Sequence, residues 1–275
     1  MVTKSLLVNA DDFGFTRDVN AGIIEAHTGG ILTATTLMAN GEAFDDAVRL
    51  SREHPSLDIG VHCVLIGGRS LLNGHEYPTN IKEFLSAMTF RRLDPYAELR
   101  VQVRKIRDAG IPLSHMDSHK HTHLHPKVLD AIARLSEEFQ IPWIRRPFDF
   151  PLSGAGMPLS KRVLGRTFAV VRPRFRSVLE RHGCRMTDHF AGFALTGRFR
   201  AAELTGLLAS LPEGTTEFMC HPGHCTDELR CASTRLKESR QRELEALTAP
   251  EVRAMLNEHD IKLMNYRDLS TGTLK

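Results

Sequence analysis

Hydrophobic and polar residues follow two periods along this chain, and the period changes every ten to twenty residues or so. Apolar, β-branched blocks predict strands, and blocks with apolar residues at helical spacing predict helices. Strands are expected at residues 4–9, 31–38, 57–65, 113–118, 141–146, 186–194, 215–221 and 261–266. Helices are expected at residues 18–27, 42–53, 81–88, 96–109, 126–139, 201–211, 238–247 and 251–259, and less regularly at 160–182.

Strands that alternate with helices predict a parallel sheet with right-handed crossovers. No internal repeat or long low-complexity linker interrupts the pattern, so residues 1–275 are interpreted as one domain. Polar residues gather where five of the predicted strands end: Asp11 and Asp12, His62, Asp117 to His123, Arg145 and Arg146, and His221. The carboxyl ends of five strands meet only if the sheet curls into a ring. We therefore expect an α/β fold, a distorted (β/α) barrel of seven to eight strands, rather than an open sheet.

Composition places the chain among ordinary globular proteins, since 41% of its 275 residues are hydrophobic and 25% are charged. A net charge of +3 is too weak to predict nucleic-acid binding. No stretch approaches the ~20 apolar residues of a membrane span, and the apolar start at residues 5–8 is too short for a signal peptide. The five cysteines contain no C-x-x-C pair and fit reduced thiols. A cytoplasmic location is expected.

The segment from Ser114 to Pro126 carries histidine or aspartate at every second position. In an extended chain these side chains would share one face, because strand side chains alternate. Imidazole and carboxylate groups are ligands that Zn²⁺ and similar divalent ions take from proteins. Histidine-rich tracts can also be solvated surface. Apolar residues before this tract and a helical pattern after it place it inside the fold, which favours a metal site.

Three further polar features lie at matching strand ends. Asp11 and Asp12 are neighbours whose side chains point in different directions, so one could hold a metal while the other acts as a general base. The alternative without a catalytic role is that such a pair caps a helix. His62 and His221 each lie in an apolar strand, where a lone histidine is usually a satisfied core residue. Taken together with the histidine tract, they indicate one shared site.

Five motifs resemble the YdjC-like carbohydrate deacetylases, a family that includes chitooligosaccharide deacetylase. The motifs occupy residues 9–14, 30–36, 60–62, 115–123 and 220–222. The resemblance implies a distorted barrel of the glycoside hydrolase/deacetylase type, one divalent ion, either Mg²⁺ or Zn²⁺, and hydrolysis of the N-acetyl group of a sugar. It implies Asp12, His62 and His119 as metal ligands and Asp11 as the base. A homodimer is also expected from this resemblance.

The resemblance extends to a possible substrate class. Residues 188–193 and 211–214 are similar to hopanoid-biosynthesis-associated members of the family. The expected partner is therefore an N-acetylated sugar, an oligosaccharide or a glycolipid headgroup. The basic residues between 161 and 181 predict either peripheral contact with an anionic membrane or a solvated helix face.

The remaining residues of the tract and its neighbours have less defined roles. His221 is the chosen proton donor to the leaving amine, with His121 and His123 as alternatives. Asp117 is expected to orient a ligating histidine through its free N–H.

Arg145 and Arg146 are expected to bind sugar hydroxyls or an anionic group, or else to be exposed basic residues at the rim. Two rival functions remain open at this point. One is a metal-dependent phosphoesterase on a similar barrel, and the other is a sugar-binding barrel without catalysis.

Overall fold

The computed structural model describes residues 4–150 and 171–271. Its strands lie in the order β5–β4–β3–β2–β1–β7–β6, and β8 pairs with β1. Every one of these strand pairs is parallel. The strands are β1 (Lys4–Phe13), β2 (Ala34–Leu37), β3 (Asp58–Cys63), β4 (Leu113–Ser118), β5 (Trp143–Ile144), β6 (His189–Ala191), β7 (Gly214–Cys220) and β8 (Ile261–Leu263).

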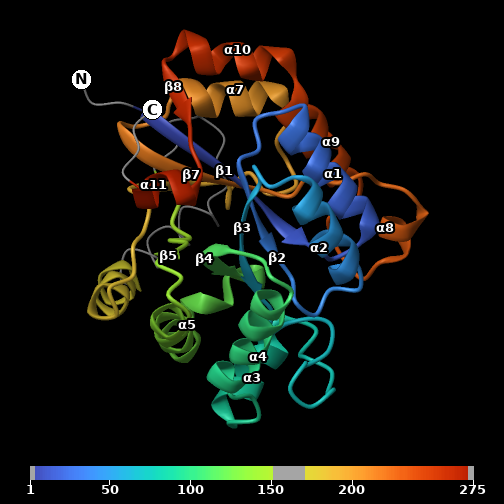
Figure 1. Ribbon diagram of the computed structural model, residues 1–275, viewed down its shortest axis with the longest axis vertical. Coiled ribbons are helices and arrows are strands. Elements are labelled where there is room, and N and C mark those ends of the chain that lie inside the picture. The colour runs from blue at the N-terminus through green and yellow to red at the C-terminus, as the bar shows by residue number, and fades with distance from the viewer. Residues whose placement is uncertain (1–3, 151–170, 272–275) are drawn as a thin grey trace.

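Helices surround this sheet on its outer side (Figure 1). They are α1 (Arg17–Thr28), α2 (Phe44–Glu53), α3 (Ile81–Thr89), α4 (Pro95–Asp108), α5 (Pro126–Phe139), α7 (Ala201–Ala209), α8 (Asp227–Cys231), α9 (Glu238–Thr248), α10 (Pro250–Glu258) and α11 (Tyr266–Thr271). Residues 171–181 are also helical. Among neighbouring helices, α4 packs against α5, α1 against α2 and α9, and α7 against α10. The predicted α/β barrel is confirmed.

The barrel is distorted at two places. The strands at the ends of the order, β5 and β6, are connected by isolated parallel bridges, Trp143 with Arg185 and Asp149 with Phe190. The N–H of Phe150 adds a hydrogen bond of 2.9 Å to the carbonyl of Phe190. In addition, β1 pairs with β8 through residues 4–6 and with β2 only from residue 9 onward. Short irregular segments therefore complete the ring.

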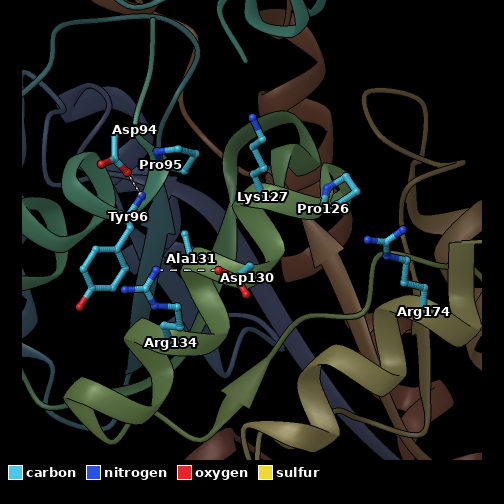
Figure 2. A pocket seen from close by; sticks show the side chains of 9 residues that line it. All are labelled: Asp94, Pro95, Tyr96, Pro126, Lys127, Asp130, Ala131, Arg134 and Arg174. Carbon is cyan, nitrogen blue, oxygen red and sulfur yellow. Dashed lines mark hydrogen bonds and ion pairs between the residues drawn. The ribbon is translucent and has the colours of Figure 1, made fainter. Parts of the chain in front are cut away.

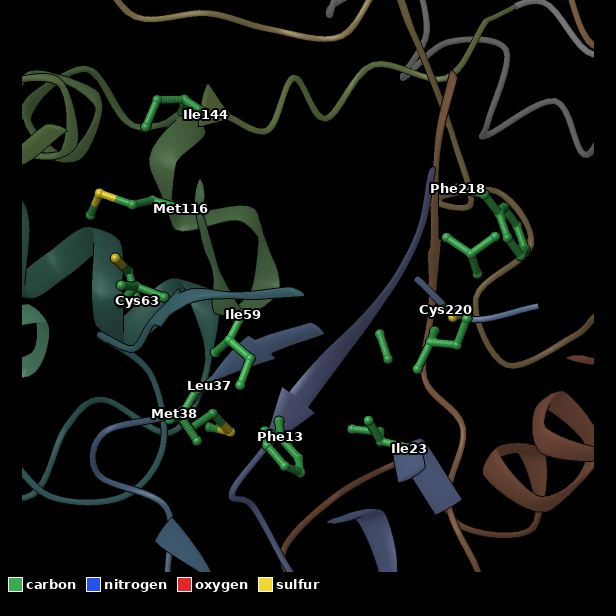
Figure 3. Packing of buried hydrophobic residues seen from close by; sticks show 14 of the residues in the cluster. Phe13, Ile23, Leu37, Met38, Ile59, Cys63, Met116, Ile144, Phe218 and Cys220 are labelled. Carbon is green, nitrogen blue, oxygen red and sulfur yellow. The ribbon is translucent and has the colours of Figure 1, made fainter. Parts of the chain in front are cut away.

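The apolar strands are explained by burial on both faces. All residues of β2 and β3, and all but the first residue of β1, are buried, as expected for parallel strands covered by helices. Figure 3 shows Leu37, Ile59 and Met116, from three neighbouring strands, within one apolar cluster. This core fixes the strand ends, and with them the polar residues at the carboxyl edge.

Several local predictions differ from the structure. β1 continues through Asp11 and Asp12 to Phe13, because the chain pairs with β2 beyond a register shift. The short helices α8 and α11 were not expected, since neither is long enough to show a helical period. The predicted irregular helix at 160–182 lies partly outside the described residues. Within the described part of the chain, no helix is long and apolar enough to cross a membrane.

Candidate active site

A bulge at the end of β1 separates the two neighbouring aspartates. Ala10 pairs with Thr35 and Phe13 with Leu37, so β1 contains one residue more than β2 over this interval. Such bulges redirect side chains. Asp12 has a φ of 70°, a left-handed conformation that few residues other than glycine adopt. The two carboxylates consequently face different partners, as the sequence predicted for this pair.

Asp12 lies against two histidines brought from other strands. Its Oδ1 is 3.2 Å from His62 Nε2 and 3.1 Å from His119 Nδ1, and the two imidazole nitrogens are 3.3 Å apart. His62 belongs to β3, and His119 follows the last residue of β4. Asp12 and His62 are buried, whereas the His119 side chain is 26% exposed. Three atoms that could act as metal ligands thus face a common point. The side at His119 is open to solvent.

Asp117 lies directly against His62. The two residues are register partners on β3 and β4, and Nδ1 of His62 lies 2.7 Å from Oδ1 of Asp117. Burial opposes the charged imidazole, but the carboxylates of Asp117 and Asp12 outweigh it and raise the pKa of His62 to about 10. The Nδ1–H bond to Asp117 leaves Nε2 as the atom directed toward Asp12. The predicted orienting role of Asp117 therefore has the required geometry.

Arg145 contacts this cluster and is only 1% exposed. Its guanidinium binds both oxygens of Asp11, at 2.7 and 2.8 Å. It also contacts Asp117 Oδ2 and Glu217 Oε1, each at 2.6 Å. Burial would raise the pKa of Asp11, but Arg145 outweighs burial and holds it well below the usual range. Arg145 is thus neither an exposed rim residue nor free to bind sugar hydroxyls.

Replacement of Arg145 by methionine is expected to reduce the free energy of unfolding by roughly 3–5 kcal/mol at pH 7, because it leaves buried carboxylates without their cation. Urea unfolding of the metal-free protein measures the change. Arg146→Met is the neighbouring control and should cost much less, since Arg146 is only partly buried. A loss below about 1 kcal/mol for Arg145→Met would contradict this account.

His221 is a second neighbour of Asp11. Cys220 is the register partner of Ala10, which places His221 beside Asp11, with Nε2 3.8 Å from Asp11 Oδ2. Burial lowers the pKa of His221 to about 4, so its imidazole is neutral at pH 7. The loop after His221 sits tightly on α1, because a Cβ on Gly22 would lie 2.4 Å from the Cα of Gly223.

The rest of the histidine tract does not continue β4. The strand ends at Ser118, and residues His119–Leu124 form a 3₁₀ turn in which Lys120 and His121 are left-handed. The single extended face expected for the tract is therefore wrong. His115 Nε2 lies 2.8 Å from Oδ1 of Asn9, while His125 accepts a hydrogen bond from Lys127 at the start of α5.

His121 and His123 are brought near the site by this turn. Both are buried, and burial lowers the pKa of His123 to about 3 and that of His121 well below its ordinary value. Nδ1 of His123 lies 2.5 Å from the hydroxyl of Ser118. Nδ1 of His121 has no hydrogen-bond partner among the described residues. Arg146, by contrast, donates to the carbonyl of Asp188, on the β6 side of the barrel.

Sequence reasoning missed three buried charged residues around the site: Glu217, Arg240 and Glu243. Arg240 Nη2 lies 2.5 Å from Asp12 Oδ2, and Glu243 Oε2 accepts the backbone N–H of His221 at 2.6 Å. The sequence itself contained a signal for Arg240 and Glu243. Arg240 and Glu243 share the helical face of Leu244 and Leu247, which predicts a charged pair on the buried side of α9.

The residues fit a divalent ion. Donor atoms about 2.0–2.2 Å from a shared ion lie roughly 3–3.5 Å apart, which matches the three separations at Asp12, His62 and His119. The buried charges agree, because two guanidinium groups face four carboxylates: Arg145 and Arg240 against Asp11, Asp12, Asp117 and Glu217. Full ionisation of this set leaves two negative charges for a cation to balance.

A hollow of about 350 Å³ lies elsewhere, between the first turns of α4 and α5 and Arg174 (Figure 2). Its lining residues do not include the Asp and His residues described above. Asp94 accepts hydrogen bonds from the N–H groups of Tyr96 and Ala97, and the Arg134 guanidinium lies 4.0 Å from the centre of the Tyr96 ring. Asp94, Tyr96 and Arg134 of this hollow are therefore already engaged with one another.

Fold and site together define an α/β barrel whose carboxyl strand ends carry a buried Asp/His cluster suited to a divalent ion. The chain matches the profile of YdjC-like proteins over residues 5–258. It is 33% identical over 271 residues to a protein from Brevibacillus brevis named carbohydrate deacetylase, covering 96% of this chain and 99% of that one. The chain belongs to the YdjC-like family.

Two solved structures resemble the fold. One, from Enterococcus faecalis V583, is named as a candidate cellobiose-phosphate cleavage protein and shares 26% identity at a TM-score of 0.76. The alignment covers 97% of this chain and 99% of that one. The other is the Xyl-CE4 domain of a multidomain xylanase from the hindgut metagenome of Trinervitermes trinervoides, with 9% identity and a TM-score of 0.50, over 98% and 91% of the two chains. At that identity the second likeness concerns the fold alone.

Proposed function

We propose that this protein is a metal-dependent carbohydrate N-deacetylase, which hydrolyses the N-acetyl group of a sugar and releases acetate. The names of its relatives support the reaction class. The observation that carries the proposal is the separation of two adjacent carboxylates. Asp12 faces His62 and His119, whereas Asp11 lies outside that set on Arg145. A barrel that only binds sugar has no use for a second, separately held carboxylate.

Asp12, His62 and His119 would hold the ion, either Mg²⁺ or Zn²⁺, which when bound polarises the acetamide carbonyl and lowers the pKa of a water. Asp11 accepts the proton of the attacking water. Arg145 keeps Asp11 ionised at neutral pH and fixes its orientation through two hydrogen bonds. Oδ1 of Asp11 accepts hydrogen bonds from both Arg145 and Asn9, whereas Oδ2 accepts only the one from Arg145 among the described residues and so retains a lone pair for the proton.

His221 passes this proton to the leaving amine in our proposal. Its imidazole is neutral at rest, because burial lowers its pKa to about 4, so the proton must be gained during the reaction. Asp11 is the source, since its Oδ2 lies 3.8 Å from Nε2 of His221. Burial also lowers the pKa of His121 and of His123, and among the described residues neither has a carboxylate oxygen within 4.0 Å, although both sense the charge of Asp11.

The pH dependence of metal binding follows from His62. With a folded pKa of about 10 against an ordinary 6.5, metal-free His62 is protonated at pH 7 and must lose that proton to bind an ion. Zn²⁺ affinity is therefore expected to rise about tenfold per pH unit between about pH 7 and 9. The same shift stabilises the metal-free fold fully below pH 6.5, and this contribution is lost as the pH rises through about 10.

Calorimetric Zn²⁺ titrations in two buffers of different ionisation enthalpy count the released proton directly. We expect about one proton per ion at pH 7.5. Zn²⁺ affinity that does not change between pH 7 and 9 would show that His62 is not a ligand or is neutral without metal.

The experiment that tests the function is acetate release from a substrate panel. The panel contains N-acetylglucosamine, N,N′-diacetylchitobiose and an N-acetylglucosaminyl lipid, with p-nitrophenyl phosphate as the probe for a phosphoesterase. We expect acetate from at least one sugar and no phosphate. Phosphate release without acetate would favour the phosphoesterase, and binding of chitobiose without acetate would favour a sugar-binding barrel.

A further inference from the structure

One buried arginine outside the predicted site reaches the metal-ligand cluster. Arg240 lies in the first turn of α9 and is 1% exposed. Its Nη2 lies 2.5 Å from Asp12 Oδ2, and its Nε donates to the carbonyl of Leu236 at 3.3 Å. The guanidinium is therefore held from two directions. A guanidinium fixed in this way orients the carboxylate that it binds.

The contact divides the two oxygens of Asp12 between different tasks. Oδ1 is the oxygen that faces His62 Nε2 and His119 Nδ1, and Oδ2 is the oxygen that Arg240 binds. A free carboxylate can offer both oxygens to one ion. With one lone pair of Oδ2 engaged and a guanidinium cation beside it, Oδ2 is less available to a cation than Oδ1.

The same residue connects this ligand to the loop of His221. The backbone carbonyl of Arg240 accepts the N–H of Gly223 at 3.2 Å, two residues after His221. One turn later on α9, Glu243 accepts the N–H of His221 at 2.6 Å and that of Gly197 at 2.8 Å. A single turn of α9 therefore contacts both Asp12 and the loop that carries His221.

We propose that Arg240 is a positioning residue that restricts Asp12 to one ligand oxygen and so sets the ion preference of the site. The inference rests on the proposed function only in placing the ion at Asp12, His62 and His119. Zn²⁺ usually takes four ligands and Mn²⁺ about six, so a second oxygen from Asp12 favours Mn²⁺. Without Arg240, the preference for Zn²⁺ over Mn²⁺ should fall.

The ratio of the Zn²⁺ and Mn²⁺ affinities distinguishes a positioning role of Arg240 from a purely electrostatic one. Removal of a cation beside the site strengthens the binding of every divalent ion by a similar factor, which cancels in the ratio of the Mn²⁺ and Zn²⁺ dissociation constants. The effect of restricting Asp12 to one oxygen does not cancel in this ratio, because Zn²⁺ and Mn²⁺ differ in the number of ligands they take. A role in folding alone changes the melting temperature of the metal-free protein and leaves the ratio unchanged.

The test compares wild type, Arg240→Gln and Arg240→Met, with Arg242→Met as the control on the same helix. Glutamine can keep the contact with the Leu236 carbonyl but is too short to reach Asp12. Each metal-free protein is titrated with Zn²⁺ alone and with Mn²⁺ alone. We expect the Zn²⁺ preference to fall about tenfold or more in both Arg240 variants and to stay unchanged in Arg242→Met. A wild-type ratio in the Arg240 variants would overturn the proposal.

A structure of the wild-type protein with Zn²⁺ tests the proposal even if neither variant folds. The proposal expects the ion on Oδ1 of Asp12 alone, with Oδ2 still on Arg240. Both oxygens of Asp12 on the ion would overturn it. Acetate assays on the same samples keep the two ideas apart, because a wild type that binds Zn²⁺ at this site without releasing acetate would refute the deacetylase alone.

Discussion

Replacement of Asp12 by alanine is expected to abolish metal binding and acetate release together. Asp12 supplies the only carboxylate oxygen that faces both His62 and His119 among the described residues. Loss of the ion removes several kcal/mol of transition-state stabilisation, which corresponds to a rate reduction of about a thousandfold or more. Metal content of the purified protein and acetate release from the preferred substrate measure the two effects.

Asp45→Ala is the matched control for this variant, because Asp45 is an exposed aspartate in the first turn of α2. It should retain wild-type metal content and activity. If Asp12→Ala still released acetate at the wild-type rate, the assignment of the metal site would be wrong.

Replacement of Asp11 by asparagine is expected to remove catalysis and leave the metal in place. Asparagine has the shape of aspartate but cannot take the proton of water, and loss of a general base costs about 10²–10⁴ in rate. Asp11 contacts Arg145 rather than His119, so the three ligands keep their arrangement. Zn²⁺ titration and acetate release of one preparation separate binding from chemistry.

The pair of variants is informative because the two residues are adjacent. Loss of metal from both Asp11→Asn and Asp12→Ala would mean that the carboxylates act as one unit. Wild-type activity in Asp11→Asn would identify another residue as the base, and His221 would be the next candidate because it lies 3.8 Å from the same position.

The barrel and its polar strand ends were predictable from sequence because their signals are local, whereas the choice of Asp12, His62 and His119 as ligands came from the family resemblance and stays a prediction. Apolar blocks of alternating period located the strands, and the carboxyl ends of parallel strands meet at one edge. Asp12, His62 and His119 each lie within a residue or so of such an end. The bulge at β1 changed the length of that strand without moving its carboxylates away from the site.

The misplaced parts of the site depend on contacts between distant segments. Two left-handed residues, Lys120 and His121, end the extended conformation of the histidine tract, and neither is a glycine that would signal it. In the sequence, Arg145 is indistinguishable from an exposed rim residue. Its burial becomes evident only in the fold, where three carboxylates from three other strands surround it. No local period reveals a partner 228 positions away, as in the pairing of Arg240 with Asp12.

The arrangement explains why the site tolerates so many buried charges. Arg145 and Arg240 each neutralise part of the acidic cluster, and His62 carries a proton while no ion is bound. Burial nevertheless raises the pKa of both Asp117 and Glu217, although Arg145 opposes this shift at both carboxylates.

Acetate release from N,N′-diacetylchitobiose and the other acetylated substrates, measured before chelation, after chelation and after metal is restored, tests the central claim most directly. This account predicts acetate from the native protein, none after chelation, and recovery when one equivalent of Zn²⁺ or Mg²⁺ is added. Acetate release that survives complete metal removal would contradict the role of Asp12, His62 and His119. Metal bound at these residues without acetate from any substrate would contradict the deacetylase itself.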